Sequence, residues 1–197
     1  MPSPAQAQNR GYTYADYCAW PDDQRWELID GTAYDMSPAP SRQHQEVLGE
    51  LFVQIKTRLG SSPCQAYVAP FDIRLPAGDE ADDEVMSVVQ PDIAVICDQR
   101  KLDDRGCRGA PDWIIEVLSP TTAAKDQIQK PDLYARHGVA EYWLVHPLDR
   151  LVIIYRLEAG DYGRPEIQET RGETPVDLFP GLAIDWDVIY PEPSPGG

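Results

Sequence analysis

Residues 88–96 read VVQPDIAVI and residues 113–118 read WIIEVL, and these two stretches decide the fold. Both are continuous apolar runs rather than alternating ones, which is typical of strands covered on both faces. Each run holds one carboxylate, Asp92 or Glu116. A carboxylate is costly to bury unless it is hydrogen-bonded, ion-paired or bound to a metal. We therefore predict two neighbouring central strands whose carboxylates form a polar site.

Patterns on either side of these runs predict helices and further strands. Residues 14–20 and 41–59 are expected to be helices, and RWELIDGTAYDMS is expected to form a hairpin around Asp30-Gly31. QAYVAPFDIRL, residues 65–75, is expected to be a strand with a bulge or edge position at Pro70. The order of elements predicts an α/β or α+β fold, a mixed sheet flanked by helices.

The second half of the chain continues this pattern. After caps at Ser119 to Thr122, a helix is predicted over residues 125–137, with its regular part beginning near Lys130 because of Pro131. EYWLV and LVIIYRL are expected to pair as a hairpin, and PEIQET and GLAIDW to form short edge strands. Residues 11–190 are expected to form one domain between disordered tails at 1–10 and 191–197.

Composition limits the partners and the cellular location. The chain carries 17 basic and 33 acidic side chains, a net charge of −16, which is opposite to the basic surface of a dedicated nucleic-acid binder. The acidic run GDEADDE, residues 78–84, is expected to be a solvated face. Neither a membrane span nor a signal peptide is recognisable, so a cytoplasmic protein with four reduced cysteines is expected, without a zinc site.

The Asp92 and Glu116 carboxylates are suited to a hard divalent cation such as Mg²⁺, which binds few protein carboxylates and keeps several waters. Lys130 lies on the following helix and is a candidate for placing a positive charge near the strand ends, and Lys125 and Asp126 are competing candidates. The alternation of Glu27 with its neighbours favours a solvent-facing strand position. His44 precedes the apolar stripe of its helix and is more typical of a surface or capping histidine.

Four blocks occur together in this order: WELIDGTAYDMSPAPSRQH, QPDIAVI, DWIIEVLSPTT and KDQIQKPDLYARHGVAEYWLV. Over residues 12–187 the chain resembles the Uma2 family of the PD-(D/E)XK restriction-endonuclease-like superfamily. The resemblance implies a restriction-endonuclease-like core and a divalent-metal-dependent endonuclease, with Mg²⁺ or Mn²⁺ as cofactor and DNA as the expected substrate.

The resemblance also assigns residues. Asp92 and Glu116 match the two superfamily carboxylates, whereas Leu118 stands where the motif has lysine. The resemblance therefore implies that Lys130 takes the lysine role and that Glu27 is an additional carboxylate beside the metal. His44 matches a family position without an assigned role.

Two other functions remain open on the sequence. The acidic charge favours an inactive nuclease-fold binding or assembly module, and the same site would also suit a hydrolase of another phosphoester. Edge strands and the aromatic residues Trp186 and Tyr190 are compatible with a homodimer.

Overall fold

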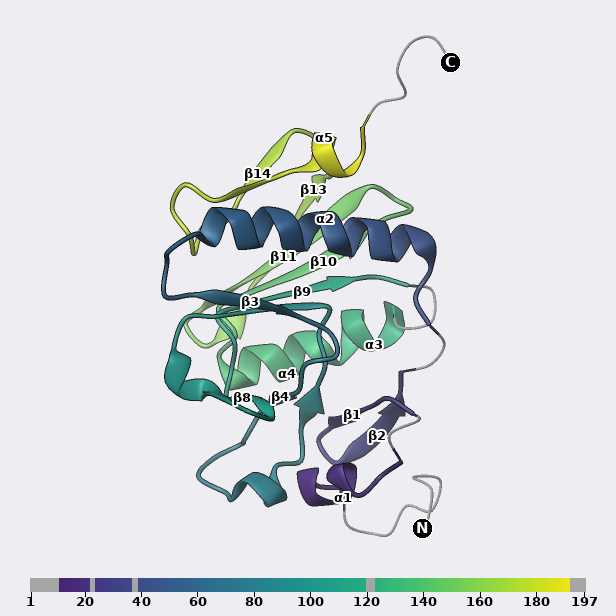
Figure 1. Cartoon of the computed structure of the whole chain (residues 1–197), viewed down its shortest axis with the longest axis vertical. Coiled ribbons are helices and arrows are strands. Elements are labelled where there is room, and N and C mark those ends of the chain that lie inside the picture. Colours follow the sequence, from purple (N-terminus) through teal and green to yellow (C-terminus); the bar gives the residue numbers. More distant parts are fainter. Residues whose placement is uncertain (1–10, 22–23, 37–38, 120–122, 192–197) are drawn as a thin grey trace.

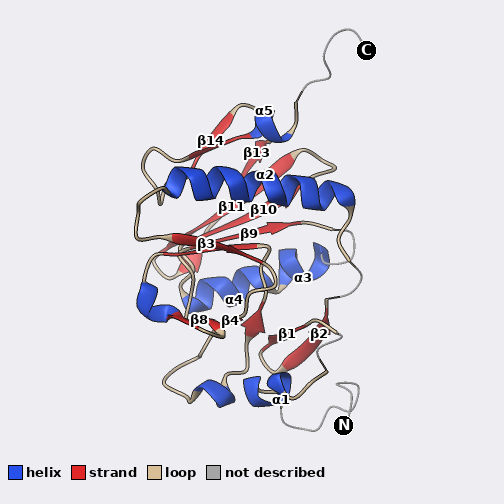
Figure 2. Cartoon of the chain, viewed as in Figure 1, coloured by secondary structure: helices blue, strands red, loops and turns tan. Residues whose placement is uncertain are grey.

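The computed structural model describes residues 11–21, 24–36, 39–119 and 123–191. The expected tail at 1–10, residues 192–197 of the tail expected at 191–197, and the caps expected at Thr121 and Thr122 lie outside these residues. The described chain has a mixed α+β architecture, as predicted (Figure 2). None of the described helices combines the length and the apolar character needed to cross a membrane.

The larger sheet has seven strands, in the order β12-β11-β10-β9-β6-β3, with β13 also paired to β11. Strands β9 and β10 are parallel, and the other neighbours are antiparallel. Its strands are β3 (Gln65–Val68), β6 (Ile93–Ile96), β9 (Trp113–Val117), β10 (Glu141–His146), β11 (Leu151–Glu158), β12 (Asp161–Tyr162) and β13 (Glu166–Glu169).

Helices cover both faces of this sheet (Figure 1). Helix α2 (Arg42–Leu59) lies against one face, where its side chains form an apolar core with alternate residues of β6, β9 and β10. Helix α4 (Lys130–His137) lies against the opposite face and contacts the intervening residues of the same strands. Because successive side chains of a strand point to opposite faces, these strands are apolar throughout, as their sequences predicted.

The smaller sheet has six strands, in the order β2-β1-β5-β4-β8-β7. The predicted hairpin is confirmed, and Asp30 and Gly31 both have positive φ at its turn. Its strands are β1 (Trp26–Ile29), β2 (Thr32–Asp35), β4 (Ile73–Arg74), β5 (Val88–Val89), β7 (Leu102–Asp103) and β8 (Gly106–Arg108). Helix α1 (Tyr14–Cys18) and two 3-10 turns, η1 (Asp82–Glu84) and η2 (Gln99–Lys101), complete this part of the chain.

Two segments predicted as single strands each cross from one sheet to the other. The segment 65–75 is divided into β3 and β4, and the segment 88–96 into β5 and β6. The breaks fall at Pro70, after a cis peptide bond, and at Pro91. Proline has no N–H to donate to a strand ladder, so both segments leave their first sheet at this residue. The single-strand predictions are therefore wrong, and Asp92 lies immediately before β6.

The helix predicted over residues 125–137 is instead two helices, α3 (Ala123–Ile128) and α4. Pro131 lies in the first turn of α4, where a missing N–H costs no intrahelical hydrogen bond. Gly138 follows with φ +85° and ends α4. The expected start of a regular helix at Lys130 is confirmed.

The C-terminal segments also form strands. The hairpin of β10 and β11 and the strand β13 are confirmed, and β15 (Ala183–Asp185) pairs with β14 (Glu173–Pro175) in a separate ribbon. The short helix α5 (Trp186–Ile189) follows, and its Trp186 is buried in the core beneath α2.

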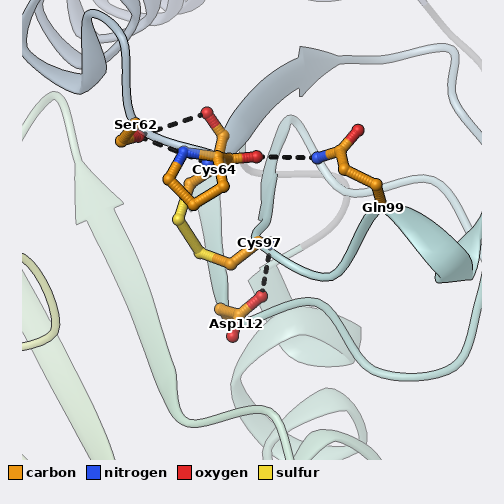
Figure 3. Close-up of a disulfide and its surroundings, with 6 residues drawn as sticks. Ser62, Cys64, Cys97, Gln99 and Asp112 are labelled. Carbon is orange, nitrogen blue, oxygen red and sulfur yellow. Dashed lines mark hydrogen bonds between the residues drawn. A yellow bond between two sulfur atoms is a disulfide. The ribbon is translucent and has the colours of Figure 1, made fainter.

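The prediction of four reduced cysteines is wrong, because Cys64 and Cys97 form a disulfide (Figure 3). The pairing of Gln65 with Ile96 in β3 and β6 places these two cysteines opposite each other, one residue beyond the strand ends. Asp112 accepts a hydrogen bond of 2.7 Å from the backbone N–H of Cys97. Cys18 and Cys107 are free thiols. The disulfide therefore joins β3, the edge strand of the larger sheet, to β6, the strand that directly follows Asp92.

Candidate active site

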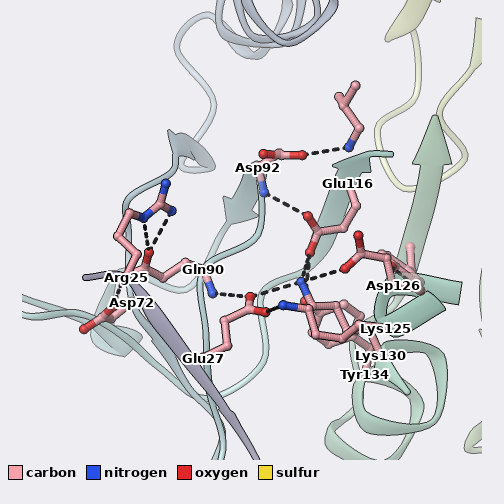
Figure 4. Close-up of polar contacts among 12 residues, drawn as sticks. Arg25, Glu27, Asp72, Gln90, Asp92, Glu116, Lys125, Asp126, Lys130 and Tyr134 are labelled. Carbon is pink, nitrogen blue, oxygen red and sulfur yellow. Dashed lines mark hydrogen bonds and ion pairs between the residues drawn. The ribbon is translucent and has the colours of Figure 1, made fainter. Parts of the chain in front are cut away.

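Asp92 and Glu116 lie side by side because β6 and β9 are antiparallel. Ile93, the first residue of β6, pairs with Ile115, so the next position outward sets Asp92 opposite Glu116 near the end of β9. The N–H of Asp92 donates to Oε2 of Glu116 at 3.3 Å, and the N–H of Val117 donates to Oδ2 of Asp92 at 2.8 Å (Figure 4). The predicted pair of neighbouring carboxylates is therefore present at one end of the central strands.

Lys130 meets the pair from the first turn of α4 (Figure 4). Its Nζ lies 2.6 Å from Oε1 of Glu116, 3.0 Å from Oε1 of Glu27 and 3.1 Å from Oδ1 of Asp126. Its side chain is 1% exposed. Leu118, which stands in the usual lysine position of the motif, is buried in the apolar core. The structure thus brings Lys130 to Glu116, as expected from the resemblance.

Glu27 is fully buried in β1, and the expectation of a solvent-facing residue is wrong. Its Oε1 accepts a hydrogen bond of 2.9 Å from the N–H of Gln90, and its Oε2 lies 2.5 Å from Nζ of Lys125. Lys125 and Lys130 therefore reach the same carboxylate from α3 and α4. These contacts place Glu27 on the lysine side of the cluster, with Lys130 between it and Glu116.

His44 reaches the site from the first turn of α2. Ser41 caps this helix by accepting a hydrogen bond of 3.2 Å from the N–H of His44. Nε2 of His44 lies 3.1 Å from Oδ2 of Asp92, and the imidazole is 7% exposed. The expected surface or capping position is therefore wrong for the side chain, which is buried against Asp92.

The charges of this cluster shift several pKa values. Burial raises the pKa of Glu116 well above its usual range, and Asp126, Asp92 and Glu27 raise it further, although Lys130 opposes them. Burial acts in the same direction on Glu27, but Lys130 and Lys125 outweigh it and lower the pKa of Glu27 to about 2. Around Glu27 the two lysines balance the negative charge, whereas around Glu116 the neighbouring carboxylates outnumber the one lysine.

The donor set fits a hard divalent cation. Four carboxylates and two ammonium groups give a formal excess of two negative charges when His44 is counted as neutral. Across the described ranges, no three His, Cys, Asp or Glu side chains form a complete metal site. Mg²⁺ does not require one, because it binds through one or two carboxylates and keeps waters. Asp92 and Glu116 supply such a pair.

A supporting network of hydrogen bonds was missed by sequence reasoning. Tyr134 on α4 donates through its hydroxyl to Oε1 of Glu116 at 3.3 Å. The side-chain amide of Gln90 donates to Asp72 at 2.7 Å and to the Tyr17 hydroxyl at 3.0 Å, while its oxygen accepts two hydrogen bonds from Arg25. Only the position of Gln90 beside the Pro-Asp pair could have drawn attention to it.

Comparisons with known proteins agree with this fold. A family described as "Uma2: Putative restriction endonuclease" matches residues 14–187. An uncharacterized protein of Synechocystis is 27% identical over 179 residues, covering 89% of each chain. The solved structure of "a putative nuclease belonging to DUF820" from Anabaena variabilis is similar with a TM-score of 0.71 and 21% identity, over 90% of this chain and 97% of that one.

Proposed function

Because the chain belongs to the Uma2 family, we propose that it is a divalent-metal-dependent endonuclease that hydrolyses phosphodiester bonds of nucleic acid, with DNA as the expected substrate. The observation that carries the proposal is the contact of Asp92 with Glu116 at the strand ends, with Lys130 bound to Glu116. This arrangement supplies two carboxylates and a fixed positive charge at one point. The structural relative titled a nuclease supports the same activity class.

Each residue has a proposed role. Asp92 and Glu116 would hold Mg²⁺ or Mn²⁺, and the chemistry that such a cation supplies is activation of a water molecule and stabilisation of charge on the phosphate. Lys130 keeps Glu116 oriented and contributes positive charge where negative charge develops on the phosphate. His44 and the N–H of Val117 fix the rotamer of Asp92.

Glu27 and Asp126 have supporting roles in this proposal. Glu27 binds both Lys125 and Lys130, and Asp126 binds Lys130 from α3, four residues earlier in the sequence. These contacts hold the Lys130 ammonium beside Glu116 and restrict its other rotamers. A buried, preorganised charge costs no rearrangement at the moment of reaction.

The test compares Asp92→Asn and Glu116→Gln with the native chain on a panel of DNA and RNA substrates in Mg²⁺ or Mn²⁺. Both variants should lose metal-dependent cleavage by about 1000-fold or more, because each removes a charged metal ligand. Asp104→Asn is the matched control, since Asp104 is exposed in the turn between β7 and β8. Equal cleavage by the native chain and both variants would refute the proposed site.

The net charge of −16 favours a second candidate, a nuclease-fold binding or assembly module without turnover. Titration calorimetry with Mg²⁺ and Mn²⁺ separates the two candidates. The enzyme should bind the ions through Asp92 and Glu116, and the two variants should not. Absence of ion binding at millimolar concentration, together with absence of cleavage, would favour the inactive module.

A further inference from the structure

A cavity of about 430 Å³ opens above the candidate active site, and its floor and wall differ in chemistry. Asp92, Glu116 and Lys130 lie at the floor. The wall is largely apolar and comes from two segments, one before α2 and one in the turn between β10 and β11. A cavity of this size is in the range of small-ligand sites.

The apolar wall combines exposed and buried groups, since Pro40 and Leu148 are exposed, Met36 is half-buried and Pro147 is buried. Met36 and Pro40 stand on one side, and Pro147 and Leu148 on the other. Leu148 is 75% exposed. The side-chain amide of Gln43 in α2 donates to the carbonyl oxygen of Pro147 at 3.3 Å and joins the two sides. The wall thus offers apolar side chains in the same cavity as the carboxylates.

Among the described cations that line the cavity, Arg25 is the one whose positive charge is not ion-paired with a carboxylate. Lys125 and Lys130 also line the cavity, but both are ion-paired with Glu27. Among the described residues, the hydrogen bonds of Arg25 go to an uncharged group, because Nε and Nη2 both donate to Oε1 of Gln90 at 3.0 and 2.8 Å. Arg25 is therefore oriented by a neutral amide while it keeps its charge for an anion.

Four other described arginines are held by carboxylates and do not extend this positive charge into a track for a duplex. Arg74, Arg108, Arg136 and Arg156 are ion-paired with carboxylates elsewhere in the fold. Binding along a DNA duplex requires several phosphates to be neutralised, and each neutralised phosphate increases the salt dependence of binding. A net charge of −16 opposes such binding.

We infer that the cavity accepts one unpaired nucleotide, so that the substrate is a single-stranded segment of nucleic acid rather than continuous duplex. The inference rests on the proposed function. Arg25 binds the phosphate next to the scissile one, and the base lies against the apolar wall near Leu148. A base that is stacked and paired inside a duplex cannot reach this wall without being extruded, which costs a few kcal/mol.

The first experiment measures metal-dependent cleavage of one labelled sequence as a single strand, as a blunt duplex and as a duplex with an unpaired bubble. DNA and RNA versions are compared in Mn²⁺, with Asp92→Asn as the background. The single strand and the bubble should be cut at least about tenfold faster, as kcat/KM, than the paired duplex. Equal or faster cutting of the duplex, still abolished in Asp92→Asn, would overturn this inference and leave the proposed function intact. No cutting of any substrate would instead contradict the proposed function.

The second experiment tests Arg25 with Arg25→Gln and Arg25→Lys, and Arg136→Gln is the control because Arg136 is an exposed arginine bound to Asp30. Arg25→Gln should raise KM for the single strand about tenfold with a smaller change in kcat, and Arg25→Lys should keep part of the affinity. The slope of log K against log salt should fall by about 1 in Arg25→Gln. An unchanged KM and salt slope in Arg25→Gln would overturn the assignment.

The apolar wall is tested with Leu148→Ser. Binding of the single strand should weaken several-fold, whereas Ile167→Ser, an exposed apolar residue on β13, should leave it unchanged. The inference fails if both serine variants bind the single strand as the native chain does.

Discussion

Arg74 and Lys130 are two cations whose side chains are each 1% exposed, and their surroundings differ. Arg74, in the smaller sheet, donates to Asp82 at 2.5 Å and to both oxygens of Asp103 at 2.7 Å. These two carboxylates are 28% and 49% exposed. The ionic partners of Arg74 therefore remain in contact with water, and the acidic run expected to be only a solvated face also binds this arginine.

Lys130 is surrounded instead by buried carboxylates. Glu27, Glu116 and Asp126 are 0%, 6% and 4% exposed at the side chain, and all three lie within 3.1 Å of its Nζ. The cavity opens directly beside this cluster, whereas the described lining of the cavity does not include Arg74. Burial of a cation alone therefore does not mark a functional site. An excess of buried negative charge next to a cavity is the more informative feature.

Among the variants that test the contrast between Arg74 and Lys130, Lys130→Met should have the largest effect on cleavage. Removing the ammonium group leaves three buried carboxylates without their common partner, so Glu116 should lose its orientation. We expect kcat/KM for metal-dependent cleavage to fall by about 100- to 1000-fold, measured beside circular dichroism to establish that the variant is folded. Cleavage at the native rate by a folded Lys130→Met would remove the functional distinction between the two cations.

Arg74→Met should have a smaller effect, and on stability rather than on chemistry. Asp82 and Asp103 are partly exposed and can be hydrated when the guanidinium is removed, so the free energy of unfolding should fall by only about 1 to 3 kcal/mol. Urea unfolding measures this change. Cleavage by the folded variant should stay within about twofold of native, and a loss as large as that of Lys130→Met would show that the smaller sheet contributes to the reaction.

Much of the larger sheet could be predicted because its strands obey a simple rule. Buried strands are continuously apolar, so β6 and β9 stand out in the sequence, and Asp92 directly before β6 and Glu116 within β9 stand out as polar residues. Their contact could be expected once the strands were taken as neighbours. The position of Lys130 came instead from the resemblance to the Uma2 family, because a lysine fourteen residues beyond Glu116 has no special local pattern.

Contacts between elements that are far apart in the sequence could not be predicted. Glu27 alternates with apolar neighbours as a surface residue would, yet α3 and α4 cover it with Lys125 and Lys130. The disulfide of Cys64 with Cys97 follows from the register of β3 and β6, and no local cysteine motif predicts it. Register and helix placement are set by tertiary contacts, and a single sequence does not display them.

Among the lysines of the cluster, the smaller effect on cleavage is expected for Lys125→Gln. Lys125 is 11% exposed and binds only one of the two Glu27 oxygens, while Lys130 and the N–H of Gln90 hold the other. Glu27 should therefore remain in place, and kcat/KM should fall by about tenfold or less. Lys56→Gln, at an exposed position of α2, is the matched control. If Lys125→Gln lost as much activity as Lys130→Met, the two lysines would act as one unit through Glu27, and the functional charge would have to be assigned to the pair rather than to Lys130.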